Sequence, residues 1–249
     1  EQADLMICNN VLAHVPNLND FIAGLKILLK PDGIATLEFP SLMKLIEQNQ
    51  FDTIYHEHFS YFSLLTVEKI FLYHGLILFD VDELNTHGGS LRIYVKHQEN
   101  TKNPISKNLS RVKLTEKNKG LDKLSFYLNF THQVEETKQQ LYNFLNEKKQ
   151  EGSFIAAYGA PAKGNTLLNF CKIGLDLIDY TVDLNPRKQG NFLPGTHIPI
   201  FHPDKIKSTM PDYLLILPWN IKNEIIEQMK FINKRGGKFI IPIPKVFIQ

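Results

Sequence analysis

A dense cluster of titratable side chains occurs where the sequence reads Tyr55-His56-Glu57-His58. Two imidazoles, a phenol and a carboxylate within four residues can move protons or bind a cation. The segment has the composition of a loop, and loops often carry such chemistry. The alternative interpretation is that these are surface residues or hydrogen-bonded core residues, and the density of the cluster argues against it.

The same cluster also permits a metal site. In an extended conformation His56 and His58 point to the same side, so that they could bind a metal together with His14 or His87. The chain has no H-E-x-x-H spacing, and no third ligand is evident from the sequence. Proton transfer is therefore the preferred chemistry for this segment.

A second candidate site is the segment Gly159-Ala160-Pro161-Ala162-Lys163-Gly164-Asn165, between a predicted strand and a predicted helix. Backbone N–H groups and the positive end of a helix can hold a phosphate there. The spacing is neither that of a Walker loop nor that of G-x-G-x-x-G. Asp183 lies near the end of the next strand, where nicotinamide enzymes place a ribose-binding acid. We expect nucleotide binding of some kind, with a plain tight turn as the alternative.

Alternating strands and helices must position these residues. Residues 5–8 form a buried-strand pattern that ends at Asn9-Asn10, and a helix follows with Asn19 or Asp20 as its N-cap. Residues 34–39 predict a second strand, parallel to the first and reached by a right-handed crossover. The pattern is that of an α/β protein.

The remaining elements extend this pattern over the chain. A helix over residues 65–73 ends at Gly75, and the turn-rich segment 85–89 predicts an antiparallel pair. Residues 96–120 are polar, with basic residues that we interpret as a solvated face, and precede a long helix. The second half predicts a smaller parallel sheet with strands at 154–158, 180–183, 213–217 and 239–243 and a helix at 222–233. We therefore divide the chain into residues 1–95, a linker and long helix over 96–150, and residues 151–249.

The composition is that of a globular protein. The 249 residues are 43% hydrophobic and 22% charged, with a formal net charge of +2. This excludes a disordered chain, and it gives no general attraction to nucleic acid or to an anionic membrane. No apolar run approaches the length of a membrane span and no signal peptide is evident, so we expect a cytoplasmic protein. Cys8 and Cys171 are predicted to be buried thiols, and the strand directly after Glu1 suggests a fragment.

Several longer motifs follow one another along nearly the whole chain. They are NVLAHVP at residues 10–16, FDTIYHEHF at 51–59, Ser63, HGGSLR at 87–92, YGAPAKGN at 158–165, Asn169-Phe170 and PGTHIP at 194–199. In this order they resemble the S-adenosylmethionine-dependent sugar C-methyltransferases, which methylate a nucleotide-linked keto-sugar at carbon. Several motifs in the same order make the resemblance more specific than any one of them.

The resemblance implies an incomplete class I methyltransferase (Rossmann-like) sheet, followed by a second Rossmann-like α/β domain that helps to hold the sugar nucleotide. S-adenosylmethionine is the implied cofactor. Its glycine-rich loop and ribose-binding acid are absent from this sequence, as are the cysteines of the family's N-terminal zinc domain. Zinc is therefore expected only in that missing domain, the cofactor site is incomplete in this chain, and Glu1 falls before the fourth strand of the methyltransferase sheet.

The resemblance also implies roles for the residues of the first cluster. His58 is the expected general base that removes the proton beside the ketone. Glu57 orients or polarises it, and Tyr55 and His14 donate hydrogen bonds to the developing enolate oxygen. His56 occupies a variable position and receives no role.

Further residues are expected to contact the cofactor or the sugar nucleotide. By the resemblance, Asn9 and Asn10 line the methyl donor, and His87 reaches the sugar or caps its turn. In the second half, the residues expected to bind the substrate are Tyr158, Ala160, Lys163, Asn165, Trp219 and Asn220. Lys163 and the amides near Ala160 hold the diphosphate, whereas Trp219 either contacts the base or is a core residue.

The preferred function is thus a SAM-dependent C-methyltransferase that methylates the carbon next to the ketone of a nucleotide-linked keto-deoxysugar, with thymidine diphosphate as the expected nucleotide. One alternative is an NAD(P)-dependent oxidoreductase that uses the Gly159 segment and Asp183. Another is a non-catalytic module that binds the sugar nucleotide. The expected partner is the nucleotide sugar, without nucleic acid or membrane, and the sequence predicts no oligomeric state.

Overall fold

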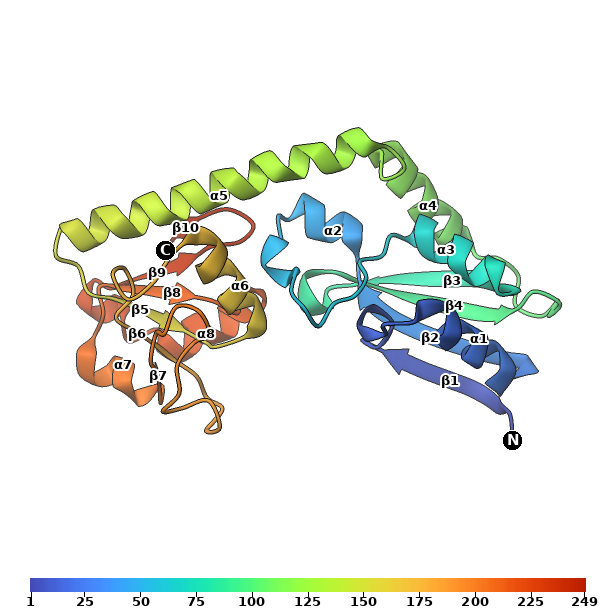
Figure 1. Cartoon of the computed structure of the whole chain (residues 1–249), viewed down its shortest axis with the longest axis horizontal. Coiled ribbons are helices and arrows are strands. Elements are labelled where there is room, and N and C mark those ends of the chain that lie inside the picture. Colours follow the sequence, from blue (N-terminus) through green and yellow to red (C-terminus); the bar gives the residue numbers. More distant parts are fainter. The chain divides into compact units, whose positions relative to one another are not determined.

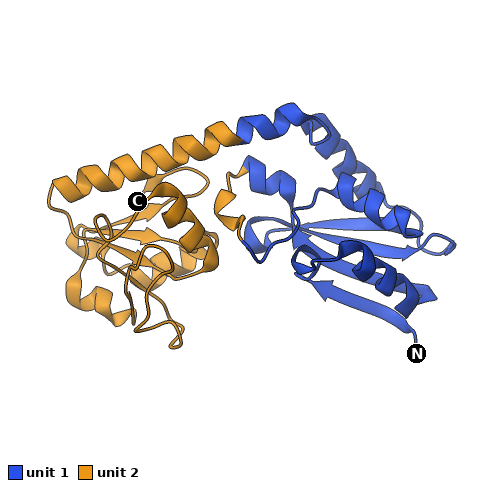
Figure 2. Cartoon of the chain, in the orientation of Figure 1, with its two compact units in different colours: residues 1–47, 56–130 blue, residues 48–55, 131–249 orange.

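A computed structural model describes all residues, 1–249, as two compact units. Unit 1 comprises residues 1–47 and 56–130, and unit 2 comprises residues 48–55 and 131–249 (Figures 1 and 2). The boundary lies within helix α5 (Leu124–Gln150). The sequence-based division instead places its boundaries after residues 95 and 150. The short segment 48–55 belongs to unit 2, although the residues directly before and after it belong to unit 1.

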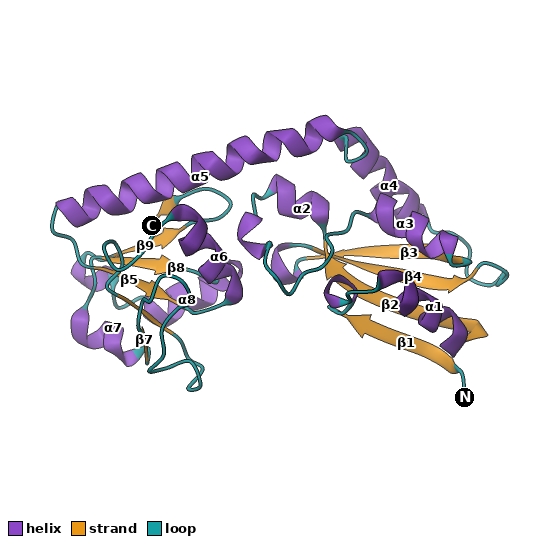
Figure 3. Ribbon diagram, viewed as in Figure 1, coloured by secondary structure: helices purple, strands orange, loops and turns teal.

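Unit 1 contains a four-stranded sheet in the order β1-β2-β4-β3 (Figure 3). β1 and β2 are parallel, whereas β4 is antiparallel to both of its neighbours. The predicted parallel pair and the predicted hairpin are therefore confirmed. The strand bounds are β1 Ala3–Asn9, β2 Leu29–Pro40, β3 Leu76–Leu84 and β4 Ser90–His97.

Strand β1 differs from its prediction in burial. Met6 and Cys8 pack against the core of unit 1, but Leu5 is 56% exposed and Ile7 is 65% exposed. Alternate side chains of a strand point to opposite faces of the sheet, and only one face of β1 is covered in this chain. The prediction of a buried strand is therefore wrong for these two residues.

The core of unit 1 joins the sheet to its helices. Ile22 of α1, Phe71 of α3 and Val112 of α4 are fully buried in one cluster with Leu37 and Ile93 of the central strands. Burial of such side chains contributes roughly 1.5–3 kcal/mol each. The helical bounds are η1 Leu12–His14, α1 Leu18–Leu28, α2 Leu42–Glu47, α3 Leu64–Tyr73, η3 Thr86–Gly88 and α4 Lys107–Lys119.

The helix ends of unit 1 agree with the predictions for α3 but not for α1. Ser63 caps α3, and Gly75 follows it with φ +69°, as the predicted helix requires. The N-cap of α1 is Asn17, whose side chain accepts from the N–H of Asp20, so the prediction of Asn19 or Asp20 is wrong. Much of the predicted polar linker is also helical, since it contains α4.

Unit 2 contains a six-stranded sheet in the order β10-β9-β8-β5-β6-β7. All neighbouring strands are parallel except β10, which runs antiparallel to β9. The four predicted strands are present, but the sheet is not the smaller one, because short strands β7 and β10 extend it. The strand bounds are β5 Ile155–Tyr158, β6 Tyr180–Val182, β7 Ile200–Phe201, β8 Tyr213–Ile216, β9 Lys238–Ile241 and β10 Phe247–Ile248.

The helices of unit 2 follow the strands in an alternating pattern, as an α/β unit requires. Their bounds are η2 Phe51–Thr53, α6 Ala162–Cys171, α7 Asp204–Thr209, η4 Trp219–Ile221, α8 Lys222–Met229 and η5 Asn233–Arg235. None of the helices combines the length and the apolar composition that crossing a membrane requires. Cys171 is buried, and burial raises the pKa of its thiol to about 12, whereas Cys8 is only half-buried.

Candidate functional site

Three of the predicted catalytic residues lie together in unit 1. The ring centroids of His14 and His58 are 4.8 Å apart, and His14 Nδ1 lies 2.8 Å from the carbonyl oxygen of Glu57. Backbone hydrogen bonds hold this arrangement, because the N–H groups of Phe59 and Ser60 both point to the carbonyl of Ala13. The loop after Glu57 is thus fixed on η1, directly beyond the carboxyl end of β1.

The contact with Glu57 determines the tautomer of neutral His14. A backbone carbonyl can only accept, so Nδ1 must carry the proton and Nε2 then has a free lone pair. Neutral His14 therefore accepts a hydrogen bond at Nε2, and it donates from that atom only as an imidazolium. His14 and Glu57 are exposed and His58 is half-buried, so that a substrate can reach the set.

Asn10 and His87 are a second pair in unit 1. The amide Nδ2 of Asn10 lies 3.5 Å from Nε2 of His87, and the backbone N–H of Asn10 donates to the backbone carbonyl of Glu38. Both residues have left-handed backbones, with φ of 55° and 54°. Because β1 ends at Asn9, the predicted cofactor residues and His87 lie at the same edge of the sheet as the His14 set.

Tyr55 is assigned to unit 2, whereas the other three predicted catalytic residues belong to unit 1. It follows η2, where Phe51 stacks against Phe170 of α6 at a centroid distance of 5.3 Å. Nothing brings His56 together with the other histidines in a ligand set. The structure contains no group of three or more His, Cys, Asp or Glu side chains that could hold a metal ion, so the alternative metal site has no ligands here.

The Gly159 segment in unit 2 forms a tight turn between β5 and α6. Gly159 has φ +93°, and a Cβ at this position would lie 2.5 Å from Cδ of Pro218. The next N–H, that of Ala160, donates to the Asp183 carboxylate at 2.8 Å, and Lys188 donates to the Ala160 carbonyl. The Ala160 amide would have to leave Asp183 before it could bind a phosphate.

Asp183 therefore has a structural role in this turn. Besides Ala160, it accepts from the N–H of Asn185 at 2.8 Å, and Lys188 Nζ lies 3.5 Å away. The carboxylate is thus already bound by two amides and an ammonium group. This arrangement weakens the nicotinamide alternative, which needs Asp183 to bind ribose hydroxyls.

Lys163, Trp219 and Asn220 form a compact cluster in unit 2. Lys163 Nζ donates to the Asn220 side chain at 2.7 Å and lies 4.4 Å from the centre of the Trp219 ring. Burial lowers the pKa of Lys163, while Asp52 opposes this shift. Two N–H donors of the ammonium group remain for an anion. Trp219 itself is only 7% exposed, and its N–H donates to Asp52 at 2.7 Å, so that its indole is a core residue with an occupied donor.

The last two predicted residues lie in the same unit. The Tyr158 hydroxyl donates to Gln228 of α8 at 2.7 Å and is therefore directed toward that helix. Asn165 lies in the first turn of α6, and its side-chain oxygen is buried without a hydrogen-bond partner. Of the two, Asn165 is the one with unused hydrogen-bonding capacity.

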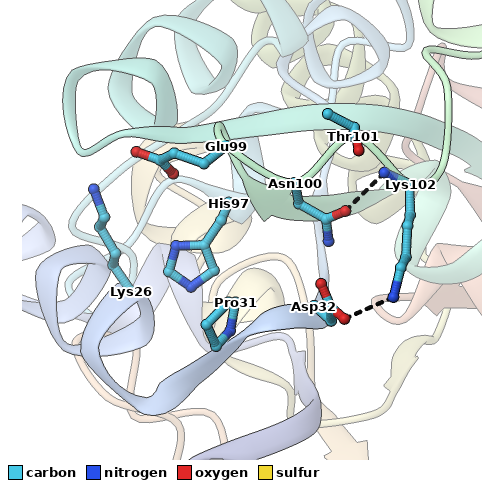
Figure 4. A pocket seen from close by; sticks show the side chains of 8 residues that line it. All are labelled: Lys26, Pro31, Asp32, His97, Glu99, Asn100, Thr101 and Lys102. Atoms are coloured by element: carbon cyan, nitrogen blue, oxygen red, sulfur yellow. Dashed lines mark hydrogen bonds and ion pairs between the residues drawn. The ribbon is translucent and has the colours of Figure 1, made fainter.

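A hollow of about 430 Å³ lies at the other end of the unit 1 sheet, away from the His14 set. Figure 4 shows its polar lining, in which Lys102 pairs with Asp32 and its N–H donates to the Asn100 side chain. The hollow is formed by the start of β2 and the end of β4. It contains none of the residues predicted from the sequence.

Comparison with known proteins agrees with the sequence motifs. Residues 85–244 match the family described as C-methyltransferase C-terminal domain, and residues 1–79 match that described as methyltransferase domain. The chain belongs to the C-methyltransferase family. The family resemblance seen in the sequence is thereby confirmed.

One curated member of the C-methyltransferase family is C-methyltransferase NovU from Streptomyces niveus. It is 36% identical over 243 residues, which cover 98% of this chain and 58% of NovU. The chain thus spans somewhat more than half the length of this relative. A solved structure described as LepI in complex with SAM matches 39% of this chain and 27% of its own, with 9% identity and a TM-score of 0.33, too low to carry an argument.

In this chain, the sequence analysis missed three buried carboxylates, those of Glu38, Asp52 and Glu116. Glu38 is 4% exposed and accepts from Arg92 at 2.8 Å and from Thr86 at 2.9 Å. Burial raises the pKa of Glu38, but these hydrogen bonds outweigh it and the net pKa is lowered. Glu38 thus fixes the turn that carries His87. Asp52 is the second and lies in the motif at residues 51–59, whereas Glu38 lies in no motif. Glu116 is the third, and its carboxylate accepts from the N–H groups of Leu64 and Leu65.

Proposed function

We propose that the full-length enzyme containing this chain methylates the carbon next to the ketone of a nucleotide-linked keto-deoxysugar, with thymidine diphosphate as the nucleotide. The observation that carries the proposal is the contact of His14 and His58 beside Glu57 at the carboxyl edge of β1. Two imidazoles in an accessible set suit proton abstraction from a weak carbon acid. Membership of the C-methyltransferase family supplies the reaction class.

His58 removes the proton from the carbon beside the ketone. The C–H electron pair moves to form the enolate, and the enolate carbon then makes the new carbon–carbon bond. S-adenosylmethionine, when bound, would supply the electrophilic methyl group; its S–CH3 bond would break, and the sulfur would leave as a neutral thioether that keeps the bonding electrons. Asn9 and Asn10 fit one edge of such a cofactor, because they end β1 and the Asn10 amide is exposed beside His87.

Enolate formation needs stabilisation of negative charge on the ketone oxygen. His14 donates from Nε2 in its imidazolium form, since Nδ1 is held by the Glu57 carbonyl. Tyr55 is the second donor, and each such donor is worth about 3 kcal/mol in related oxyanion sites. Glu57 polarises or orients His58.

Unit 2 binds the sugar nucleotide through its phosphates. Lys163 is held by Asn220 and by the Trp219 ring, so its ammonium is pre-positioned rather than mobile. A partly desolvated ammonium forms stronger charge-assisted hydrogen bonds with phosphate than an exposed one. Tyr158, Ala160 and Asn165 contribute further contacts to the substrate, for which the Tyr158 hydroxyl must first leave Gln228 and the Ala160 amide must first leave Asp183.

Replacement of the base tests the proposal directly. In the full-length enzyme, His58→Ala and His58→Gln should lower kcat by roughly 10²- to 10⁴-fold and leave the dissociation constant for the thymidine-diphosphate sugar nearly unchanged. Methyl transfer is measured with labelled S-adenosylmethionine, and binding by calorimetry. Equal losses of binding and turnover would contradict the role of His58.

A non-catalytic sugar-nucleotide module is the second candidate, because the Lys163 cluster lies in unit 2 whereas His14 and His58 lie in unit 1. A calorimetric titration of this chain separates the two. A binding module gives heat with thymidine diphosphate and none with S-adenosylmethionine, whereas a contribution of Asn9 and Asn10 to cofactor binding requires heat with both.

A further inference from the structure

Segment 48–55 is attached to unit 2 at three points. Asn49 donates to Thr137 of α5 at 2.7 Å, Phe51 stacks on Phe170 of α6, and Asp52 accepts from Trp219 of η4. Within the segment, Thr53 and Ile54 donate their N–H groups back to Gln50 and Phe51. The segment is thus a short turn, and the three contacts given above all belong to unit 2.

Asp52 is the only fully buried carboxylate among these contacts. It is 0% exposed, its Oδ2 accepts from Trp219 Nε1 at 2.7 Å, and its Oδ1 has no hydrogen-bond partner. Among charged side chains, Lys163 of α6 acts on this carboxylate, which in turn adds to burial in raising the pKa of the Cys171 thiol on the same helix. A carboxylate in this position is costly unless a donor and a positive charge compensate for its desolvation.

The Trp219 bond therefore has an energetic consequence for the whole segment. If the indole N–H is lost, the fully buried carboxylate keeps only the backbone N–H groups of Asp52 and Thr53 as nearby donors. The cost of its burial is then relieved by uptake of a proton or by movement of the segment toward water. Burial already raises the pKa of Asp52 to about 6, against the opposing effects of Trp219 and Lys163. Of the three attachments of segment 48–55, the Asp52–Trp219 pair is thus the one whose loss leaves a buried charge without its side-chain donor.

We propose that Asp52 is a positioning residue: its hydrogen bond with Trp219 holds segment 48–55 on unit 2 and thereby fixes Tyr55, three residues further along. Tyr55 belongs to the same unit as Asp52 and Trp219. Only Ile54 and Thr53 separate the two residues, and both are bound within the turn. The effect on catalysis rests on the proposed role of Tyr55 as a hydrogen-bond donor, whereas the anchoring of the segment does not.

Trp219 is the only tryptophan in the chain, so its fluorescence reports on this pair directly. The emission of the chain without ligands should change with a midpoint near pH 6, where Asp52 ionises. This transition should vanish in Asp52→Asn and Asp52→Ala and persist in the control Glu224→Gln, which removes an exposed carboxylate from the neighbouring helix α8. In Lys163→Met the midpoint should rise, because the carboxylate loses a positive neighbour. If the emission of the Asp52 variants changes with pH in the same way as that of the unsubstituted chain, the proposal is overturned.

Hydrogen exchange measures whether the segment itself is held. Amides of residues 53–55 should exchange at least about tenfold faster in Asp52→Ala and in Trp219→Phe, with a smaller effect in Asp52→Asn, which retains an acceptor for the indole N–H. Strands β5 and β8 serve as internal references. Unchanged exchange at residues 53–55 would overturn the proposal even if both variants were less stable overall.

A double-mutant cycle in the full-length enzyme tests whether Asp52 acts through Tyr55. Asp52→Asn should lower kcat for a thymidine-diphosphate keto-deoxysugar with little change in KM, and should have almost no further effect in a Tyr55→Phe background. Additive effects would contradict positioning of Tyr55. If the wild-type enzyme does not methylate such a sugar, the proposed function fails, while exchange and fluorescence still decide on Asp52.

Discussion

The two candidate regions handle their charged groups in opposite ways. In unit 1, His14 and Glu57 are exposed, and backbone hydrogen bonds to Ala13 hold the loop. In unit 2, Lys163, Asp52 and Trp219 are partly or fully buried, and they are held by one another. Groups that exchange protons with a substrate must be accessible to it. Groups that bind an opposite charge form stronger electrostatic interactions where water is excluded. The comparison predicts chemistry in unit 1 and charge recognition in unit 2.

After the His58 variants, the largest effect should come from His14, because its proposed role depends on a donor at Nε2. His14→Asn keeps an amide that can donate to the Glu57 carbonyl but removes the donor at Nε2. We expect kcat of the full-length enzyme to fall roughly 10²- to 10³-fold, with the melting temperature nearly unchanged.

The matched control is His56→Asn, a neighbouring exposed histidine without an assigned role. It should alter kcat by less than about twofold, as surface substitutions generally do. Comparable losses in the two variants would show that the rate depends on the loop rather than on the ring contact between His14 and His58.

The pH dependence of stability should separate the buried charge of unit 2 from the exposed set of unit 1. The pKa of Asp52 is about 6 in the folded chain, against an ordinary value of 3.8, so the folded form holds a proton that the unfolded chain releases between these values. This contribution to the free energy of unfolding is fully present below about pH 4 and is lost as the pH rises through 6. The total loss is about 3 kcal/mol. Urea unfolding between pH 4 and 8 measures it, and Asp52→Asn should remove this dependence.

Two glycines with similar backbones test how closely the unit 2 turn is packed. Gly159 has φ +93° with Pro218 against it, while Gly152 has φ +85° with open space around it. Gly152→Ala should cost about 1 kcal/mol of unfolding free energy from backbone strain alone. Gly159→Ala should cost about 2 kcal/mol more, because Pro218 must move. Equal losses of unfolding free energy in the two variants, measured by urea unfolding, would show that the contact with Pro218 does not contribute to the cost of the Gly159 substitution.

The smallest effect should be on substrate affinity. Lys163→Met retains most of the side-chain volume over Trp219 and removes the charge, so that binding of thymidine diphosphate should weaken about tenfold, or about 1.4 kcal/mol. Lys234→Met, an exposed lysine of η5 in the same unit, is the control and should leave affinity unchanged. Calorimetry at two salt concentrations measures the affinity of both variants for thymidine diphosphate. Equal losses of affinity in the two variants would show that the diphosphate does not bind at Lys163.

Much of the fold could be predicted because its signals are local. Apolar periodicity located the four predicted strands of unit 2 and the hairpin of unit 1, and Ser63 and Gly75 marked the ends of α3. Strands β7 and β10 were missed because two residues are too few to show an alternating pattern. The exposed Leu5 and Ile7 were misassigned because an apolar strand looks the same whether or not its outer face is covered.

The sequence by itself determined the family, the α/β class and the short segments in which the site residues lie, since motif order and periodicity are properties of neighbouring residues. Only the tertiary structure showed that His14 meets His58, that Asp183 is bound to Ala160, and that Asp52 accepts a hydrogen bond from Trp219, 167 positions away. Such pairs leave no local pattern, because burial and partnership arise when distant elements pack together. The roles that depend on them follow from the fold rather than from any one motif.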